Sequence, residues 1–312
     1  MIFFSVGTGA GLGLTFWVLV WQLLGLTDAG QPQFWTGAVL GGVLLTFGLM
    51  SSTRHLANPK NAWRSLTRVG SSWLSREGLL ALLCYPLAGL HLWLSVARSP
   101  LVVVTGPLLA LLALGIVFCT AMIYACLKTV PRWRTWHTPA LYLLYALASG
   151  LLLWIAINDR PSGPLARIEV GDASRWAFAL LIGAALVKAL FLAKFSQRRR
   201  ATINDALAVP PAAAAGAAGR VQGRVRLLDP GHSHRTFLTN EFGFRVARER
   251  AAVLRGWMFA LTLAAPLLLL RLLPDAQGLA ALCLLAGLLI ERWLFFAEAE
   301  HVVRLYHGQQ AV

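Results

Sequence analysis

The chain has 312 residues, of which 57% are apolar and only 13% are charged, and its mean hydropathy is +0.64. Soluble domains carry about 25% charged residues, so this chain has too little polar surface to be soluble, and it is too apolar to be disordered. The 28 Lys and Arg residues exceed the 13 Asp and Glu residues. Because this positive charge lies between apolar blocks, it favours contact with anionic lipid headgroups over nucleic-acid binding.

Eight apolar segments are each long enough to form a membrane-spanning helix. A helix needs about 20 residues to cross a hydrocarbon core of about 30 Å. The sequence therefore predicts an all-α, polytopic integral membrane protein with eight transmembrane helices packed as bundles. In chain order, the predicted spans are 2–26, 35–53, 78–96, 101–127, 138–157, 174–195, 256–273 and 279–303.

A long polar segment divides the predicted spans into two blocks. Residues 1–195 hold six predicted helices and the loop 54–77, and residues 256–312 hold two helices and the C-terminus. Between them, residues 196–255 form a basic loop that contains the stretch PPAAAAGAAG. This stretch predicts a flexible linker. Residues 240–254 predict an amphipathic helix that either lies on lipid headgroups or docks on a protein.

Basic residues are unevenly divided between the two sides of the predicted bundle. The loops 54–77, 128–137 and 196–255 hold 19 Lys and Arg residues, whereas the alternate loops hold five. Cytoplasmic loops of membrane proteins carry an excess of basic residues. The sequence therefore predicts that these three loops and both termini are cytoplasmic. A basic docking face for a partner protein would give the same asymmetry.

The cysteines and histidines do not form the patterns that hold a metal or a haem. All four cysteines, Cys84, Cys119, Cys126 and Cys283, lie inside predicted spans, and no CxxC motif occurs. Iron–sulfur clusters and structural zinc need several closely placed thiolates. A b-type haem would need two intramembrane histidine ligands, and His91 is the only histidine well inside a predicted span. We therefore expect neither haem nor an iron–sulfur cluster in this chain.

The loop 54–77, RHLANPKNAWRSLTRVGSSWLSRE, carries the residues best suited to chemistry. Pro59 ends the second predicted helix, because a proline disfavours the helical conformation of the residue before it, and His55 then lies at the membrane surface. Glu77 begins the third predicted helix, where the helix dipole favours a carboxylate. A histidine that titrates near neutral pH and a carboxylate at one membrane face suit a quinone headgroup, whose reduction consumes protons. The alternative is that both residues only cap helix ends, with Glu77 paired to a nearby arginine.

Further ionisable residues inside the predicted spans are candidates for a proton path. His91 follows Glu77 by two heptads on nearly the same helix face, and Glu291 and Glu298 are seven residues apart in the last predicted span. Intramembrane ionisable groups are rare and usually face the bundle interior or a water path. The alternatives are a hydrogen-bonded interior histidine and a structural ion pair between Glu291 and an arginine.

Three segments carry a family resemblance: RHLANPKNAWRSL followed by SSWLSRE, TVPRWRTWHTP at 129–139, and ERWLFFAEAEHV at 291–302. They resemble the membrane-anchor subunit of dimethyl sulfoxide reductase and its relatives. The resemblance implies an anchor without haem or metal that binds a quinone, ubiquinone or menaquinone, at the membrane surface. It also implies two partners. One is an iron–sulfur subunit that exchanges electrons with the quinone, and the other is a catalytic subunit that carries molybdopterin.

The resemblance further implies a set of quinone-site residues. The family's quinone-site histidine corresponds to His55, which would bond a quinone carbonyl, and its essential glutamate corresponds to Glu77, which would accept or relay a proton. Nearby arginines would stabilise negative charge that develops on the headgroup. Ala57 stands where the family usually has Gly, and Asn61 stands where a basic residue is usual. The full predicted set is Arg54, His55, Trp63, Arg64, Ser65, Arg68, Glu77 and Thr138.

The blocks SSWLSREG, LLDPGH and ERWLFFAEAEH resemble the sulfite-oxidising branch of the family more than its reductases. The predicted orientation agrees, because a cytoplasmic sulfite dehydrogenase would dock on cytoplasmic loops. We therefore predict a quinone-reducing anchor subunit of a bacterial inner membrane, with sulfite chemistry in a partner subunit. The alternatives are a quinol-oxidising anchor of a dimethyl sulfoxide reductase-type enzyme, a secondary transporter and a purely structural membrane tether.

Overall fold

The computed structural model describes residues 1–53, 59–158, 164–196, 202, 250–273, 276–302 and 305. Within these ranges the regular elements are helices, and eight helical stretches are long and apolar enough to cross a membrane. The predicted fold class, an all-α polytopic membrane bundle, is confirmed. The Ala- and Pro-rich stretch, most of the amphipathic helix predicted over 240–254, and the candidate residues Arg54 and His55 lie outside the described residues.

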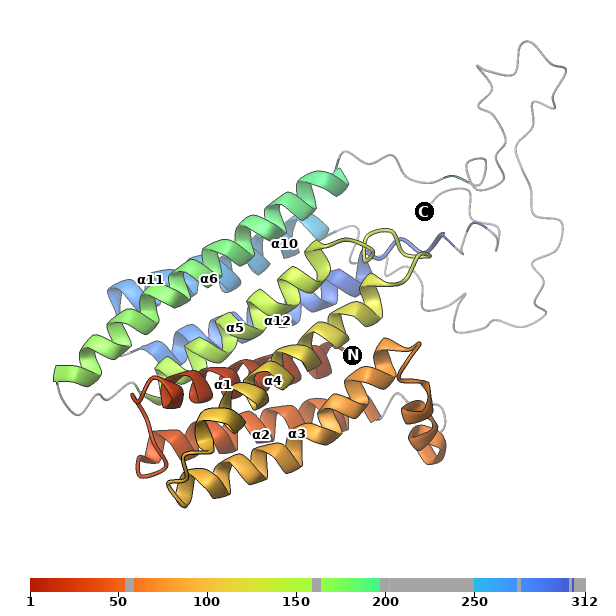
Figure 1. Ribbon diagram of the computed structural model, residues 1–312. Helices are drawn as coiled ribbons and strands as arrows, with labels where there is room; N and C mark the ends of the chain where they lie inside the picture. The colour runs from red at the N-terminus through yellow and green to blue at the C-terminus, as the bar shows by residue number, and fades with distance from the viewer. Residues whose placement is uncertain are drawn as a thin grey trace, which may run out of the picture.

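Successive spans cross the bundle in alternating directions (Figure 1). A short 3₁₀ helix, η1 (Pro59–Arg68), lies between the second and third spans. The seventh span is a single rod made of three pieces, because the π-helical turn η3 (Ala260–Ala264) interrupts it. The other helices are α1 (Ile2–Leu23), α2 (Pro32–Thr53), α3 (Trp73–Val96), α4 (Val102–Ala125), α5 (His137–Ile157), α6 (Pro164–Ser196), α10 (Ala251–Phe259), α11 (Ala265–Leu272) and α12 (Gln277–Ala297).

Several span boundaries differ from the prediction, and polar residues at the helix ends explain the difference. The third helix begins at Trp73 rather than at 78, because the Ser72 side chain accepts a hydrogen bond from the Ser75 N–H at 3.3 Å and so caps it. The last helix ends at Ala297 rather than at 303, and Glu298 is its C-cap residue. A prediction from hydropathy leaves such polar first turns outside the span. The sixth helix begins at Pro164, but its apolar span begins at Ala173, close to the predicted 174. The seventh span begins at Ala251 rather than at 256.

The two ends of the bundle can be told apart by the chain segments that lie at each end. We call the end that holds Met1 and the C-terminal end of α12 the N-terminal face, and the other end the opposite face. Because the number of spans is even, both of these chain positions lie on one side. Figure 1 shows η1 at the same end as the N-terminus. The described parts of two predicted basic loops, 59–72 and 128–136, therefore lie at the N-terminal face.

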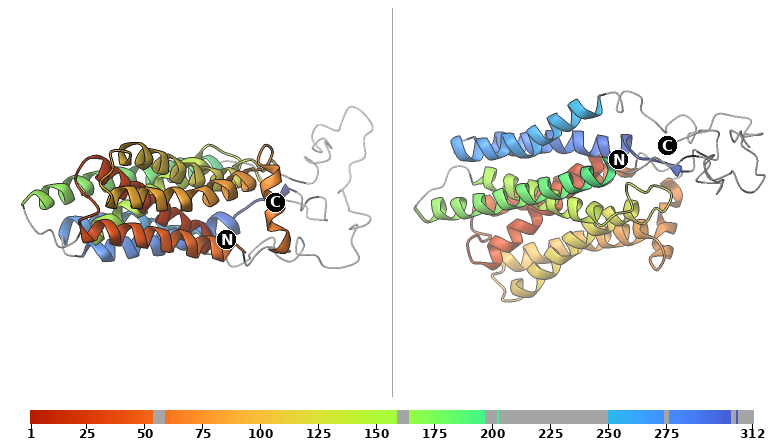
Figure 2. Two further views of the ribbon diagram at one scale, coloured as in Figure 1. Left: turned by 60° about the horizontal axis from the view of Figure 1, so that its bottom comes forward. Right: turned by 90° about the horizontal axis from the view of Figure 1, so that it is seen from above.

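Helices α1 and α5 form the centre of the bundle. α1 packs against α2, α4, α5 and α12, and α5 also contacts α4, α6 and α12. Figure 2 shows the same helices from two further directions. Small residues permit the closest approach. A side chain at Gly13 of α1 would overlap the backbone of Ala146 in α5, and Gly41 of α2 faces Thr15 of α1.

The outer surface of the bundle is apolar. Val39, Trp93 and Leu111 are 60%, 65% and 69% exposed, and many other large apolar side chains are similarly open. Water would disfavour so much exposed apolar surface, whereas lipid tails cover it. The structure is therefore that of a multi-pass membrane protein.

Candidate functional site

Glu77 lies inside the third span rather than at its start. It is the fifth residue of α3 and only 4% exposed. Because a helix rises about 1.5 Å per residue, its Cα lies about 6 Å deeper than the first helical residue. Ser72 caps the helix, and the Arg76 guanidinium donates hydrogen bonds to the carbonyls of Val69 and Gly70. Glu77 is therefore neither the cap of α3 nor paired with Arg76.

The Glu77 carboxylate accepts a hydrogen bond from the Thr120 hydroxyl of α4. The same hydroxyl lies 3.0 Å from the Ile116 carbonyl oxygen. A hydroxyl has one proton to donate and can also accept. It can donate to an ionised Glu77, or donate to the Ile116 carbonyl and accept the proton of a neutral Glu77. Both protonation states of Glu77 are therefore hydrogen-bonded in one arrangement of side chains.

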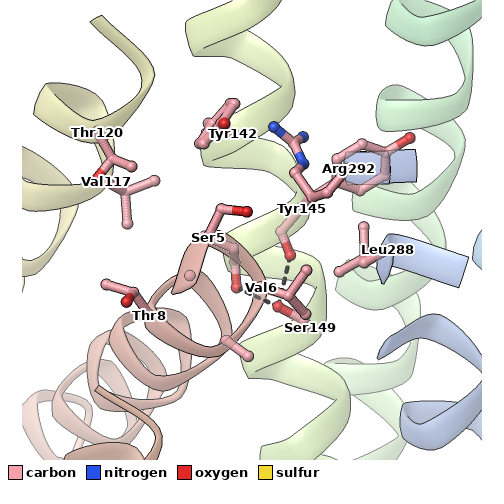
Figure 3. A pocket seen from close by; sticks show the side chains of 13 residues that line it. Ser5, Val6, Thr8, Val117, Thr120, Tyr142, Tyr145, Ser149, Leu288 and Arg292 are labelled. Atoms are coloured by element: carbon pink, nitrogen blue, oxygen red, sulfur yellow. Dashed lines mark hydrogen bonds between the residues drawn. The ribbon is translucent and has the colours of Figure 1, made fainter. Parts of the chain in front are cut away.

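A small internal cavity adjoins Thr120. Its volume of about 20 Å³ is enough for one water molecule. Side chains of α1, α4, α5 and α12 line it, and Figure 3 shows Thr120 on one side and Tyr142, Tyr145 and Arg292 on the other. The Tyr142 hydroxyl and the Arg292 Nη1 have no hydrogen-bond partner within the described part of the chain. The cavity thus offers unsatisfied polar groups of the kind that bind a buried water.

A second buried carboxylate, Glu291, lies on α12 between two cations. Its Oε1 is 2.6 Å from Nζ of Lys188 on α6, and its Oε2 is 2.7 Å from Nε of Arg292. The three side chains are at most 5% exposed. The Arg292 guanidinium also lies 3.8 Å from the centre of the Tyr142 ring. One negative and two positive groups give this ion cluster, Lys188–Glu291–Arg292, a net charge of +1.

A third carboxylate, Glu298, lies just beyond α12 at the N-terminal face. Its oxygens are 2.8 Å from guanidinium nitrogens of both Arg132 and Arg255, and its side chain is 10% exposed. A cavity of about 10 Å³ lies between these three residues and Lys188. The prediction that Glu298 belongs to the last membrane span is wrong, because the helix ends one residue earlier and the two arginines pair with the carboxylate beyond the helix end.

Both ring nitrogens of His91, which lies near the opposite face, have hydrogen-bond partners. Its Nδ1 is 2.8 Å from the Thr105 hydroxyl, its Nε2 is 2.8 Å from Oε1 of Gln22, and it is 1% exposed. His91 and Glu77 share α3, but 14 residues separate them, which is about 21 Å along a helix. Its contacts are those of a hydrogen-bonded interior histidine.

Three residues of the predicted quinone set on η1, Trp63, Arg64 and Arg68, are at the surface. Trp63 is 63% exposed, and the Arg64 guanidinium lies 5.7 Å from the centre of its ring. Arg68 is exposed at the end of η1, and Ser65 lies in the same short helix. η1 packs against α3. These residues therefore lie beside the helix that carries Glu77.

Thr138, also in the predicted quinone set, has a different position. It is 3% exposed, and its hydroxyl donates a 2.7 Å hydrogen bond to the Trp133 carbonyl. That bond ties the start of α5 to the preceding loop. The structure therefore brings η1 and Glu77 to one region of the N-terminal face but uses the Thr138 hydroxyl within the protein.

Sequence reasoning missed Thr120 and Lys188. Lys188 had a usable signal, because it is a lysine well inside a predicted span and such residues usually face the bundle interior. Thr120 had none, since threonines are common in membrane helices and its partner Glu77 is 43 residues away. Only the packing of α3 against α4 brings the two together.

The cysteines show no metal-binding arrangement in the part of the protein that the structure describes. All four are free; Cys84 and Cys119 are buried, and Cys126 is exposed. Among the described residues, no three or more His, Cys, Asp or Glu side chains gather so as to hold a metal ion.

The fold and its buried groups define a multi-pass helical membrane protein whose buried carboxylates gather toward one face. Residues 1–297 match the DMSO reductase anchor subunit (DmsC) family. The chain belongs to this family of membrane anchor subunits, as its sequence blocks predicted.

Curated relatives fall in two branches. The chain is 29% identical over its whole length to a sulfite dehydrogenase subunit of Allochromatium vinosum, and the alignment covers 98% of that protein. It is 32% identical to the anaerobic dimethyl sulfoxide reductase chain YnfH of Escherichia coli, over 42% of this chain and 46% of that one. Identity to a second anaerobic dimethyl sulfoxide reductase chain of Escherichia coli is 33%, over 36% of this chain and 40% of that one. No solved structure matches the protein.

Proposed function

We propose that this chain is the quinone-reactive membrane anchor of a sulfite-oxidising complex with molybdopterin and iron–sulfur subunits. The observation that carries the proposal is the similarity to the sulfite dehydrogenase subunit of Allochromatium vinosum, which spans this whole chain and 98% of that protein. Similarity to the reductase chains extends over 42% of this chain or less. A quinol-oxidising role in a reductase is the second candidate, supported by those partial matches.

The chemistry requires both electrons and protons at the anchor. Oxidation of sulfite to sulfate by water releases two electrons and two protons, and reduction of a quinone to a quinol takes up two of each. Partner subunits would deliver the electrons, because the family consists of anchor subunits of such complexes. This chain would bind the quinone at the N-terminal face and supply the protons.

Glu77 suits the proton-transfer step. It is buried at the N-terminal face, and the Thr120 hydroxyl can bond it in either charge state. A carboxyl that is satisfied in both states can give up and regain a proton without rearranging its surroundings. We propose that Glu77 donates to the quinone and that His55, in the preceding loop, bonds a carbonyl of the headgroup.

The surroundings of Glu77 suit a lipid-soluble ring with polar oxygens. Leu66 and Trp63 of η1 are 38% and 63% exposed, so an apolar surface lies next to the helix that carries Glu77. We propose that Arg54, Arg64 and Arg68 stabilise charge on the headgroup, with Trp63 and Ser65 beside it. Thr138 would act indirectly, by fixing the start of α5.

The proposed orientation places the N-terminal face in the cytoplasm. Loops 54–77, 128–137 and 196–255 hold 19 Lys and Arg residues, and cytoplasmic loops carry such an excess. The iron–sulfur subunit would dock on this face, with acidic groups against the basic loops. In this arrangement, segment 196–255, between the blocks 1–195 and 256–312, contributes to docking.

The decisive experiment uses the purified complex with sulfite as electron donor. Replacing Glu77 by Gln should lower quinone reduction by about a hundredfold or more, the usual weight of a positioned acid–base group. Reduction of a water-soluble acceptor, which takes electrons directly from the partner subunits, should remain normal. Asp28→Asn, which removes an exposed carboxylate at the opposite face, is the matched control and should change neither rate.

Three other results would decide against the proposal. Normal quinone reduction by the Glu77→Gln complex would remove Glu77 from the site. A complex that oxidises quinol with a sulfoxide, and does not oxidise sulfite, would favour the reductase branch. A complex whose quinone reduction is unchanged when this chain is omitted would leave the chain as a structural tether.

A further inference from the structure

A line of buried polar groups connects Glu77 with the surface at the other side of the N-terminal face. It crosses from α3 through α4 to α12 and α6, and it includes groups that the proposed quinone site does not use. Hydrogen bonds, ion pairs and two small cavities connect its members. In order, the members are Glu77, Thr120, the 20 Å³ cavity, Arg292, Glu291, Lys188, the 10 Å³ cavity and Glu298.

The first cavity has the features of a water site. It is lined by Thr120, which bonds Glu77, and by two groups without a partner among the described residues, the Tyr142 hydroxyl and the Arg292 Nη1. Burying a donor without an acceptor is unfavourable, and one water can satisfy both groups. A water there would extend the hydrogen bonds of Glu77 and Thr120 as far as Arg292 (Figure 3).

The ion cluster contains one more cation than Glu291 needs. Arg292 alone forms a close pair with it at 2.7 Å, and yet Lys188 is also buried against it at 2.6 Å. Removing a second cation from water is unfavourable unless something offsets it. Lys188 differs chemically from Arg292, because a lysine can release a proton inside a protein whereas an arginine stays charged.

Lys188 also has a way to regain a proton. It lines the 10 Å³ cavity together with Arg132, Arg255 and Glu298, whose ion pairs lie at the N-terminal face. The volume is close to what one water needs. The charged groups that face Lys188 are therefore Glu291 on α12, Glu298 just beyond that helix, and the two arginines that pair with Glu298.

We propose that these groups form a proton route from the N-terminal face to Glu77, in which Lys188 exchanges the proton with Glu291. This inference rests on the proposed function. A proton passes from Lys188 to Glu291, whose Oε2 has no hydrogen-bond partner among the described residues. A water that bonds this oxygen and the Arg292 Nη1 carries the proton on, and the Thr120 hydroxyl accepts a proton from that water as it gives its own to an ionised Glu77. Lys188 then takes a proton from water at the surface. The cluster returns to its resting charge after each transfer, and the entry point lies away from η1, where the quinone is proposed to bind.

The test is Lys188→Arg in the intact complex, because arginine keeps the positive charge beside Glu291 and removes the exchangeable proton. Sulfite-driven quinone reduction should fall about tenfold or more, and its slowing in heavy water should increase. The rate with a water-soluble electron acceptor should not change. Lys194→Arg, the same substitution at an exposed position on the same helix, is the control and should behave as the unaltered complex.

A Lys188→Arg complex with full quinone reduction and an unchanged heavy-water effect would overturn the route. If that variant does not assemble, Lys188→Gln decides the question, because it leaves Glu291 paired with Arg292 and also removes the exchangeable proton. It should lower quinone reduction likewise, and full quinone reduction in this variant would overturn the route. Loss of quinone reduction in Glu77→Gln together with normal rates in the Lys188 variants would reject the route and retain the proposed function.

Discussion

Two buried carboxylates near the same face of the bundle have opposite surroundings. Glu77 is 4% exposed and bonds a neutral hydroxyl, that of Thr120, whereas Glu291 is 0% exposed and touches two cations. A neutral partner that can donate or accept leaves a carboxyl free to change its charge, whereas two cations favour the ionised form. Burial alone therefore does not reveal which acid of a membrane protein can rest in either charge state.

The largest expected difference between the two carboxylates is in stability. Glu291→Gln leaves Lys188 and Arg292 buried without a counter-charge, which should destabilise the protein by about 3–5 kcal/mol. Glu77→Gln keeps a side-chain oxygen that can accept from Thr120 and should change stability by less than about 1 kcal/mol. Thermal unfolding of the two variant complexes in detergent measures the difference. Equal unfolding temperatures would contradict the comparison.

The effect of His91 should be intermediate. His91→Leu leaves Gln22 and Thr105 without their ring-nitrogen partners, which should destabilise the protein by about 1–3 kcal/mol. Because His91 lies near the opposite face, the assembled variant should still reduce quinone at the normal rate. The rate is best compared below the lowered unfolding temperature. A large loss of quinone reduction there would make His91 part of the proton path.

The smallest effect is expected at Glu298, whose two ion pairs lie near the N-terminal face. Glu298→Gln weakens ion pairs with Arg132 and Arg255, and the Arg255 side chain is 37% exposed. Solvent screens the pair with Arg255, whereas Arg132 is only 13% exposed, so the loss should be about 1–2 kcal/mol, and the part due to Arg255 should shrink as salt is added. The salt dependence of unfolding checks this prediction. A loss as large as that of Glu291→Gln, unaffected by salt, would place Glu298 in the buried class.

The fold could be predicted from the sequence because a membrane span must be apolar, and hydropathy measures this property directly. A span needs a long apolar block, and eight such blocks are present. Helix ends were harder to predict from the sequence. The first turn of α3 contains the polar residues Ser75 and Arg76, so its hydropathy is lower than that of a membrane span. This is why Glu77, predicted at a helix start, proves to lie a full turn inside the bundle.

The candidate site was predictable only in part. Glu77 was predicted from the family resemblance. Glu291 was predicted because it is an ionisable residue inside an apolar block. Their partners Thr120 and Lys188 come from other helices, 43 and 103 residues away in sequence. No local pattern encodes such pairs, since they depend on how the helices pack. The chemistry that distinguishes the two carboxylates therefore becomes visible only in the structure.

The central claim is that Glu77, and not Glu291, is left with a changed protonation state when quinone is reduced; Glu291 takes a proton only in passing and returns to its ionised form. Infrared difference spectroscopy of the complex, before and after quinone reduction, detects the carbonyl stretch of a carboxylic acid that gains or loses a proton. We expect one such band, absent from Glu77→Gln and present in Glu298→Gln. A carboxylic acid band that persists unchanged in Glu77→Gln would contradict the claim.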